Sequence, residues 1–370
     1  MKKKCFNCSK IIFTGGGTGG HVIPNIPLIK KFKEMNWEVF YIGSKNSFEE
    51  KIAFSLGIIF FSIRTGKLRR YFSLKNVTDF FLVIKGIFQA LIIMRKINPS
   101  VIFSKGGFVS VPVVIAAWLL RIPIIAHESD VTLGLSSRIT LFLSDKFCCG
   151  FPVTKDIYYR KNIIFTGTPI RQEIKKADKV LGLKIIKDTP EKKPFLFIIG
   201  GSTGAEKINT FVRKNLFKIL EKYQIIHICG KGNEDRSLLD IHGYNQFSYI
   251  DENFFNILAI ADIVVSRGGA TSLYELGVLN KPTLVIPLSV IASRGDQIDN
   301  AKYFKQLGLA EILYEEDLNI DNFLSNLEKM HYKKYEIKEE ENIFKHTDSI
   351  NDIVKTILDV CNNKKTARKN

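Results

Sequence analysis

Short apolar runs alternate with longer amphipathic segments along most of the chain. In the first half, the apolar runs at residues 11–13, 39–42, 58–61, 101–103 and 123–127 predict buried strands, with shorter β-like runs at 146–149 and 163–166. Between them, the sequence predicts helices from Pro24 to about Met35 and over 47–56, 77–91 and 111–120. Because strands and helices alternate, the pattern predicts an α/β fold with parallel strands.

The second half repeats this plan. Apolar runs at 195–199, 225–229, 247–250, 263–266 and 283–286 predict strands, with helices ending near Leu220, over 253–261 and from about Asn300. The lysine-rich segment 175–194 separates the halves, and we expect it to be irregular. The sequence therefore predicts two doubly wound, Rossmann-like domains.

The signals weaken after Glu311, where the chain becomes charged. A short stripe of Ile350, Ile353, Val354 and Ile357 follows a Ser349-x-x-Asp352 capping pattern, and it predicts a last helix that packs on one of the domains. Residues 364–370 form a basic tail that we expect to fray.

One predicted helix carries more apolar residues than a single buried face needs. Val77, Phe80, Phe81, Ile84, Ile87, Phe88 and Leu91 form the stripe expected to face the core, which leaves Leu82, Val83, Ile93 and Met94. The flanking basic residues are Lys67, Arg69, Arg70, Lys75, Lys85, Arg95 and Lys96. The extra residues therefore form either a surface that rests on anionic lipid or a second packed face under a loop.

Composition and charge narrow the possible partners. The 370 residues are 45% hydrophobic and 25% charged, which excludes a disordered chain and a small disulfide scaffold. The formal net charge of +17 favours an anionic partner: nucleic acid, an acidic membrane or a phosphorylated substrate.

The six cysteines show no framework spacing, so a reducing cytosol is expected. No apolar tract approaches the roughly 20 residues of a spanning helix, and no signal peptide is predicted.

The first predicted strand ends in a glycine-rich turn, residues 15–20, that leads to His21 and a helix. Such a turn presents backbone N–H groups and a helix N-terminus to an anion, most often a phosphate. Gly15, Gly17 and Gly20 also fit the dinucleotide spacing G-x-G-x-x-G, so a nicotinamide oxidoreductase is an alternative. That class usually has an acid at the end of the second strand, and none follows Ile42. The missing acid weakens the alternative.

Three further glycine turns follow predicted strands, at 104–107, 200–204 and 266–269. The last one opens a helix that carries small hydroxyl residues at its start and Glu275 one turn in. Glu275 can accept hydrogen bonds from a ribose, or it can simply stabilise the helix start. Asp296, Gln297 and Asn300 can bind sugar hydroxyls or cap a helix.

Several of these motifs, taken together and in order, resemble the MurG glycosyltransferases. They are 16–21 (Gly-Gly-Thr-Gly-Gly-His), 106–110 (Gly-Gly-Phe-Val-Ser), His127-Glu128, Pro169-x-Arg171, 200–205 (Gly-Gly-Ser-x-Gly-Ala), and the segment from Arg267 through Glu275 to Gln297 and Asn300. The resemblance runs from about residue 11 to 310. It implies a GT-B fold, with an acceptor and membrane-side domain at 1–172, a UDP-GlcNAc domain at 173–340, and a helix in 341–370 that packs back on the first domain.

The resemblance also implies an activity. It is transfer of N-acetylglucosamine (GlcNAc) from UDP-GlcNAc to the C4 hydroxyl of the muramoyl sugar of lipid I, with inversion, to give lipid II for peptidoglycan synthesis. The implied partners are UDP-GlcNAc, lipid I and an anionic membrane surface, at the cytoplasmic face of the cell membrane. A nucleic-acid-binding module, the third class considered, lacks interleaved aromatics on a basic groove.

By position, the resemblance implies roles for individual residues. Ile250 would meet uracil, Glu275 the ribose and Gln297 the GlcNAc hydroxyls. The full donor set is Thr18, Gly19, Gly20, Asp130, Arg171, Ser202, Ile250, Ala270, Thr271, Ser272, Leu273, Glu275 and Gln297, and the acceptor diphosphate set is Gly16, Gly17, Gly106 and Gly107. Two positions depart from the family pattern: Ser129-Asp130 stands in place of Gln-Asn, and Thr168 in place of Asn.

The chemistry needs a base for the attacking hydroxyl and stabilisation of the departing UDP. His21 is the first candidate base and Glu128 the second, although a histidine at a helix start can also act as a cap. The helix start near Ala270 and Arg171 can stabilise the charge on the leaving group. No Asp-x-Asp occurs in the chain, so we expect no metal and no cofactor.

Overall fold

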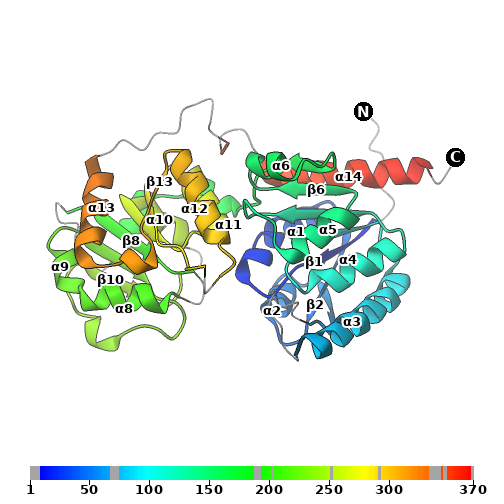
Figure 1. Cartoon of the computed structure of the whole chain (residues 1–370), viewed down its shortest axis with the longest axis horizontal. Coiled ribbons are helices and arrows are strands. Elements are labelled where there is room, and N and C mark those ends of the chain that lie inside the picture. The colour runs from blue at the N-terminus through cyan, green and yellow to red at the C-terminus, as the bar shows by residue number, and fades with distance from the viewer. Residues whose placement is uncertain are drawn as a thin grey trace. The chain divides into compact units, whose positions relative to one another are not determined.

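The computed structural model describes residues 9–66, 75–186, 193–201, 204–250, 253–290, 293–332, 343–344 and 348–367. The chain divides into two compact units (Figure 1). Unit 1 contains residues 1–170 together with 347–370, and unit 2 contains residues 171–346. The last segment of the chain therefore belongs to the first unit.

Unit 1 is built on a parallel seven-stranded sheet in the order β3-β2-β1-β4-β5-β6-β7. Its strands are β1 (Lys10–Thr14), β2 (Glu38–Ser44), β3 (Ile59–Ile63), β4 (Val101–Ser104), β5 (Ile124–Glu128), β6 (Lys146–Cys149) and β7 (Ile163–Phe165). The helices are α1 (Asn25–Glu34), α2 (Phe48–Ser55), α3 (Lys75–Ile97), α4 (Ser110–Leu119), α5 (Leu135–Leu143), α6 (Pro152–Tyr158) and α14 (Ser349–Ala367), with the 3₁₀ turn η1 (Gly19–His21). The strand order reverses between β1 and β4, which is where ligands bind in such sheets.

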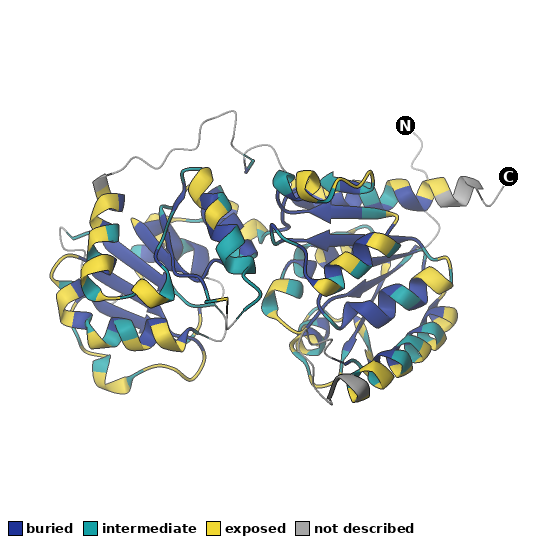
Figure 2. Ribbon diagram, viewed as in Figure 1, coloured by how far each residue is buried: buried dark blue, intermediate teal, exposed yellow. Residues whose placement is uncertain are grey.

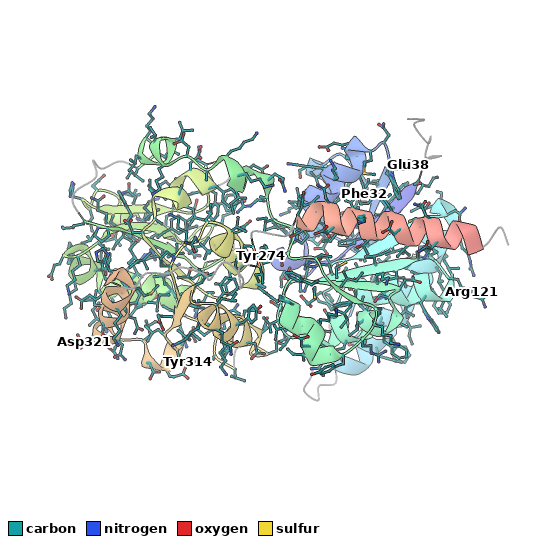
Figure 3. The ribbon with its side chains drawn as sticks, turned by 90° about the horizontal axis from the view of Figure 1, so that it is seen from above. Phe32, Glu38, Arg121, Tyr274, Tyr314 and Asp321 are labelled. Atoms are coloured by element: carbon teal, nitrogen blue, oxygen red, sulfur yellow. The ribbon has the colours of Figure 1, made fainter. Side chains whose placement is uncertain are left out.

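Alternate residues of β1 explain why both faces of this sheet are covered. Ile11 and Phe13 belong to a buried cluster with α1 and α14, whereas Ile12 belongs to a cluster with α3 and α4. α14 contributes Ile353 and Ile357, both fully buried. It lies along unit 1 beside Phe32 of α1 (Figure 3), so burial of its apolar stripe fixes it there.

Unit 2 has a parallel six-stranded sheet in the order β10-β9-β8-β11-β12-β13. The strands are β8 (Phe195–Ile199), β9 (Gln224–Ile228), β10 (Tyr244–Phe247), β11 (Ile263–Ser266), β12 (Thr283–Val285) and β13 (Ala310–Ile312). The helical elements are η2 (Gln172–Lys176), α7 (Lys179–Leu183), α8 (Glu206–Lys214), α9 (Leu216–Leu220), η3 (Arg236–Leu238), α10 (Phe254–Ile260), α11 (Ala270–Val278), α12 (Asp296–Gln306), η4 (Glu315–Asp317) and α13 (Ile320–Tyr332). The expectation of two Rossmann-like doubly wound domains is confirmed.

The structure corrects the predicted core face of helix α3. Phe80, Phe81 and Phe88, expected in the core, are 57%, 63% and 61% exposed. The buried side of the helix is formed by Val83, Ala90, Met94 and Ile97, which lie against α4 and the sheet. The exposed residues of α3 lie along the side of the helix that faces solvent (Figure 2), and the phenylalanines belong to that exposed set.

Other differences are local. The third strand predicted for unit 2, residues 247–250, lies instead at Tyr244–Phe247, and the segment 175–194 contains α7, which packs on α10. Elements β13 and α13 had no predicted counterpart because their apolar residues are spread among charged ones. Asp348, not Ser349, caps α14, since its side chain accepts the N–H of Asn351. α14 also extends into the expected frayed tail, as far as Ala367.

Candidate functional site

The candidate site in unit 1 lies at the carboxyl ends of β1, β4 and β5. The register pairs Thr14 with Ser104 and Ser104 with Ala126, so the residues that follow these strands begin at one level of the sheet. The two glycine turns of unit 1 thus start side by side, at the point where the strand order reverses.

These two turns touch each other through their backbones. A Cβ added to Gly107, which has φ of +80°, would lie 2.2 Å from the carbonyl oxygen of Gly16. Gly17, with φ of +87°, would place a Cβ 2.6 Å from the Phe108 ring. Both positions require glycine, because neither the backbone conformation nor the space admits a side chain. The expected acceptor residues Gly16, Gly17, Gly106 and Gly107 therefore lie together.

His21 ends the short helix η1 above this pair of turns. Its Nδ1 is 2.8 Å from Oγ1 of Thr18, which orients the ring. The other side of the ring faces the β4 turn, since a Cβ at Gly106 would lie 3.8 Å from Nε2. Thr18 and Gly20 are exposed, so this part of the turn is open to solvent.

Glu128, the last residue of β5, is almost fully buried and already hydrogen-bonded. Its Oε1 accepts the N–H groups of Ser129 (2.8 Å) and Asp130 (3.2 Å), and its Oε2 accepts from Oγ of Ser137 (2.5 Å). The carboxylate therefore orders the turn that carries Asp130, which is partly exposed.

Buried polar atoms without a protein partner cluster at this same edge. Nζ of Lys105, Nδ1 of His127, Oγ of Ser129 and Oγ1 of Thr168 have no hydrogen-bond partner among the described residues. His127 Nε2 is 2.8 Å from the carbonyl oxygen of Gly167. Burial lowers the pKa of His127, and the positive charge of Lys105 lowers it further, so its imidazole is neutral.

The candidate site in unit 2 lies at the carboxyl ends of β8 and β11, again where the strand order reverses. Ile199 pairs with Ser266, so the turn at 200–204 and the turn at Gly268 start at one level. Ser202 lies outside the described residues. α11 follows the second turn and presents the backbone N–H groups of Ala270, Thr271 and Ser272 at its N-terminus. This edge is suited to binding a diphosphate.

Arg171 and Glu275 meet at this edge. Nε and Nη2 of Arg171 lie 3.2 and 3.3 Å from the two carboxylate oxygens of Glu275. The guanidinium also lies 4.7 Å from the ring centre of Phe254 and 4.4 Å from that of Phe255, at the start of α10. Desolvation raises the pKa of Glu275, and the Arg171 charge opposes that rise. The sequence indicated both charged residues, but not their pairing or the two rings.

The other residues considered for binding UDP-GlcNAc make contacts of their own or are buried. Gln297 accepts the N–H of Leu288 at its Oε1 (3.0 Å), which leaves its amide nitrogen for another partner. Asn300 is fully buried and donates to the carbonyl oxygen of Gly268 (3.2 Å), so it fixes the glycine turn. Ile250 is buried and follows β10, while Leu273 is fully buried inside α11.

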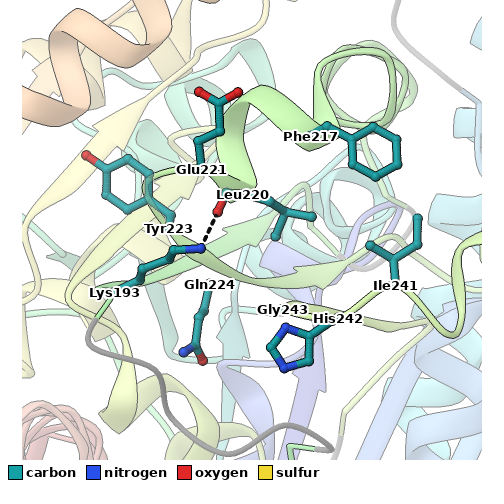
Figure 4. Close-up of a pocket in the computed structure, with 9 residues that line it drawn as sticks. All are labelled: Lys193, Phe217, Leu220, Glu221, Tyr223, Gln224, Ile241, His242 and Gly243. Carbon is teal, nitrogen blue, oxygen red and sulfur yellow. Dashed lines mark hydrogen bonds between the residues drawn. The ribbon is translucent and has the colours of Figure 1, made fainter.

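A hollow of about 420 Å³ lies elsewhere in unit 2 (Figure 4). It is lined by residues next to the amino ends of the strands, including Lys193, Gln224 and Gly243. Nζ of Lys193 donates to the carbonyl oxygen of Leu220 across 3.0 Å. The hollow is at the edge of the sheet opposite the glycine turns, so it is distinct from the candidate site.

Comparisons with known proteins agree with this arrangement. Residues 11–147 match the glycosyltransferase family 28 N-terminal domain, and residues 195–357 match the glycosyltransferase family 28 C-terminal domain. Two solved structures have a similar fold. Acinetobacter baumannii MurG superposes with a TM-score of 0.72 at 20% identity, covering 95% of this chain and 99% of that one. Methanocaldococcus jannaschii UDP-GlcNAc 2-epimerase superposes with a TM-score of 0.63 at 14% identity, covering 95% of this chain and 99% of the epimerase chain.

Curated relatives are far more similar in sequence. A Bacillus cereus protein is 48% identical over 321 residues, covering 87% of this chain and 91% of its own length. A Lachnospira eligens protein is 47% identical over 350 residues, covering 95% of this chain and 99% of its own length. The L. eligens protein is named UDP-N-acetylglucosamine--N-acetylmuramyl-(pentapeptide) pyrophosphoryl-undecaprenol N-acetylglucosamine transferase, and the B. cereus protein carries the same name with the number 2. With both family 28 domains in order and these relatives along most of its length, the chain belongs to the MurG family of UDP-GlcNAc-dependent N-acetylglucosaminyltransferases.

Proposed function

We propose that the protein transfers GlcNAc from UDP-GlcNAc to the C4 hydroxyl of the muramoyl sugar of lipid I, with inversion, and so makes lipid II for peptidoglycan synthesis. The observation that carries the proposal is the 47% identity over 350 residues to a relative named for this transfer. Such an enzyme would contribute to cell-wall biogenesis and hence to cell shape and division.

In this proposal unit 2 binds the nucleotide. Glu275 accepts from the ribose, since a carboxylate has acceptor sites beyond the two that Arg171 occupies. The first turn of α11 and Arg171 stabilise the diphosphate and the charge that develops on departing UDP, with no metal required. Ile250, Ser202 and Gln297 complete the donor set, at the uracil, the diphosphate and the GlcNAc hydroxyls.

Unit 1 binds the acceptor. The paired glycine turns around Gly16 and Gly107 hold the lipid diphosphate with their backbone N–H groups. The proposal assigns Thr18, Gly19, Gly20 and Asp130 to contacts with the donor sugar. His21 takes the proton from the attacking hydroxyl at Nε2, because Nδ1 is held by Thr18. Glu128 is less suited to this role, because Ser129, Asp130 and Ser137 already occupy its carboxylate.

We further propose that the α3–α4 surface, defined as Phe80, Phe81, Phe88, Ile92, Trp118 and Leu119, rests on anionic lipid at the cytoplasmic face of the cell membrane. These side chains are between 53% and 67% exposed, and α3 and α4 pack side by side. Lys85, Arg95, Lys96 and Arg121 on or after these helices are exposed and positively charged. Within the described residues, no helix combines the length and apolar character needed to cross a bilayer.

Turnover with labelled UDP-GlcNAc against a panel of lipid-linked acceptors tests the reaction. The proposal predicts that label enters a lipid-extractable product only when a muramoyl diphosphate lipid is supplied, with UDP released in equal amount. Analysis of the anomeric configuration of the new bond tests inversion. Absence of labelled lipid with lipid I present would exclude the proposed activity.

A further inference from the structure

Glu315, the first residue of η4 after β13, carries a buried carboxylate between two cations. Its side chain is only 3% exposed. Oε2 accepts from Nζ of Lys207 across 2.9 Å, and Oε1 accepts from Nη1 of Arg267. Burial alone would raise the pKa of Glu315, but the hydrogen bonds from Lys207 and Arg267 outweigh that effect and lower it. The carboxylate is therefore ionised at neutral pH.

Arg267 belongs to the glycine turn that opens α11. It lies between Ser266, the last residue of β11, and Gly268, and its side chain is 10% exposed. Nη1 of Arg267 also donates to the carbonyl oxygen of Ile286, directly after β12, across 3.3 Å. The N–H of Ile286 in turn donates to the carbonyl oxygen of Ser266 (2.8 Å). The guanidinium thus fastens the turn to the segment that follows β12.

Lys207 connects the same carboxylate to the other glycine turn of unit 2. It is the second residue of α8, three positions after Gly204, which ends the turn at 200–204. The Lys207 side chain is 67% exposed, so the buried Glu315 is the fixed member of this ion pair. Glu315 therefore joins the starts of α8 and α11, the two helices that follow the glycine turns.

Arg267 is poorly placed to bind a substrate itself, because its guanidinium is buried against Glu315 and Ile286. We propose that Glu315 and Arg267 are a positioning pair, which holds the turn at 266–269 and the start of α11 in place to bind the diphosphate of the UDP donor. This inference rests on the proposed function and adds two residues to it. Without the carboxylate, Arg267 would be an uncompensated buried charge, so the guanidinium and its turn would move toward solvent.

The substitution E315Q tests the pair, because glutamine keeps the size of the side chain and removes its charge. Titration calorimetry with UDP on the intact protein measures donor-side binding without any lipid. We expect the Kd for UDP to rise about tenfold in E315Q and in R267M, and no further in the double variant, because the two residues act as one unit. The KM for UDP-GlcNAc should rise by a similar factor, with kcat changing less than about threefold.

The matched control is E311Q, since Glu311 on β13 of the same unit pairs with Nζ of Lys305 at 3.0 Å. It should leave the Kd for UDP unchanged. Tighter binding of UDP by E315Q would mean that Arg267 contacts the diphosphate directly once its partner is removed, and would overturn the proposal. A lower Tm of E315Q with an unchanged Kd would overturn it too, as would multiplied effects in the double variant.

If E315Q does not fold, E315D takes its place, since it keeps the charge but shortens the reach to Arg267. Failure of both variants to fold would assign Glu315 a purely structural role and overturn the proposal. Intact binding of UDP by the unsubstituted protein, combined with inactivity toward lipid I, would instead count against the proposed function.

Discussion

Arg171 and Glu275 form a bidentate ion pair between residues 104 positions apart in sequence, with the guanidinium lying over the rings of Phe254 and Phe255. The pair joins the segment before η2 to the first helix after the second glycine turn of unit 2. A carboxylate at this place that is fixed in orientation can accept from a sugar hydroxyl without further ordering. Glu275 and Arg171 are therefore expected to act as one unit.

Glu275→Ala should raise the KM for UDP-GlcNAc by about tenfold or more, with a smaller change in kcat, because it removes a binding contact and leaves Arg171 unpaired. Initial-rate kinetics with varied UDP-GlcNAc measure this. Lys305→Ala is a control, since the Lys305–Glu311 pair lies on α12 and β13 away from the glycine turns. An unchanged KM in E275A would remove the ribose assignment.

The raised pKa of Glu275 also predicts a pH dependence of stability. Above about pH 4.5, the ordinary pKa of a glutamate, the unfolded chain loses this proton first, so the folded state binds more protons and stability falls as pH rises toward the folded pKa. Each unit of raised pKa costs about 1.4 kcal/mol. Between pH 4.5 and the folded pKa, E275Q should therefore gain stability relative to the unsubstituted protein. Above the folded pKa, the difference in stability should stay constant.

Denaturant unfolding of both proteins from pH 4 to pH 8 checks this. The difference in free energy of unfolding should be flat at the acid end and then move in favour of E275Q. A difference that moves in the opposite direction would mean that the Arg171 pair outweighs desolvation.

The sequence predicted the strands that bear glycine turns well, because a buried parallel strand is a short apolar run ended by a turn residue. It predicted which residues lie at the carboxyl ends of the strands, such as Glu275 and Gly107, but not which residues these contact. The pairing of Arg171 with Glu275 and the burial of Lys105 depend on strand order and long-range packing, which local patterns do not specify.

Helix α3 shows how an apolar pattern can be misinterpreted. Its phenylalanines fit a core stripe by spacing, yet the smaller residues Val83, Ala90 and Met94 face the sheet. Large rings dominate a hydrophobicity pattern, whereas close packing against α4 selects small residues. The outward rings could not be identified without knowing which elements α3 packs against.

Phe81→Ser with Phe88→Ser should weaken binding to vesicles that contain anionic phospholipid, because each ring exposes a large apolar area on the α3–α4 surface. We expect about a tenfold or greater loss in the partition coefficient, with little change in Tm since both rings are already exposed. Vesicle sedimentation at several salt concentrations measures it, and binding should weaken as salt rises.

A control for this pair is Phe217→Ser, which removes one exposed ring on α9 of unit 2. Its vesicle binding should equal that of the unsubstituted protein. Equal loss in both variants would mean that any exposed ring contributes, and retained binding in F81S/F88S would remove the α3–α4 surface as the lipid contact.

Substitutions of His21 and Thr18 should lower kcat by different factors. If His21 removes the proton of the attacking hydroxyl, His21→Ala should lower kcat by about 10²- to 10⁴-fold while the KM for UDP-GlcNAc changes little. Thr18→Val removes only the group beside Nδ1, at 2.8 Å, and should lower kcat by a smaller factor because the ring is kept but less well oriented. Ser137→Ala removes the hydrogen bond to Oε2 of Glu128, the second candidate base. Its kcat is compared with that of H21A. A parallel loss of kcat and donor affinity in H21A would instead assign His21 to holding the glycine turn.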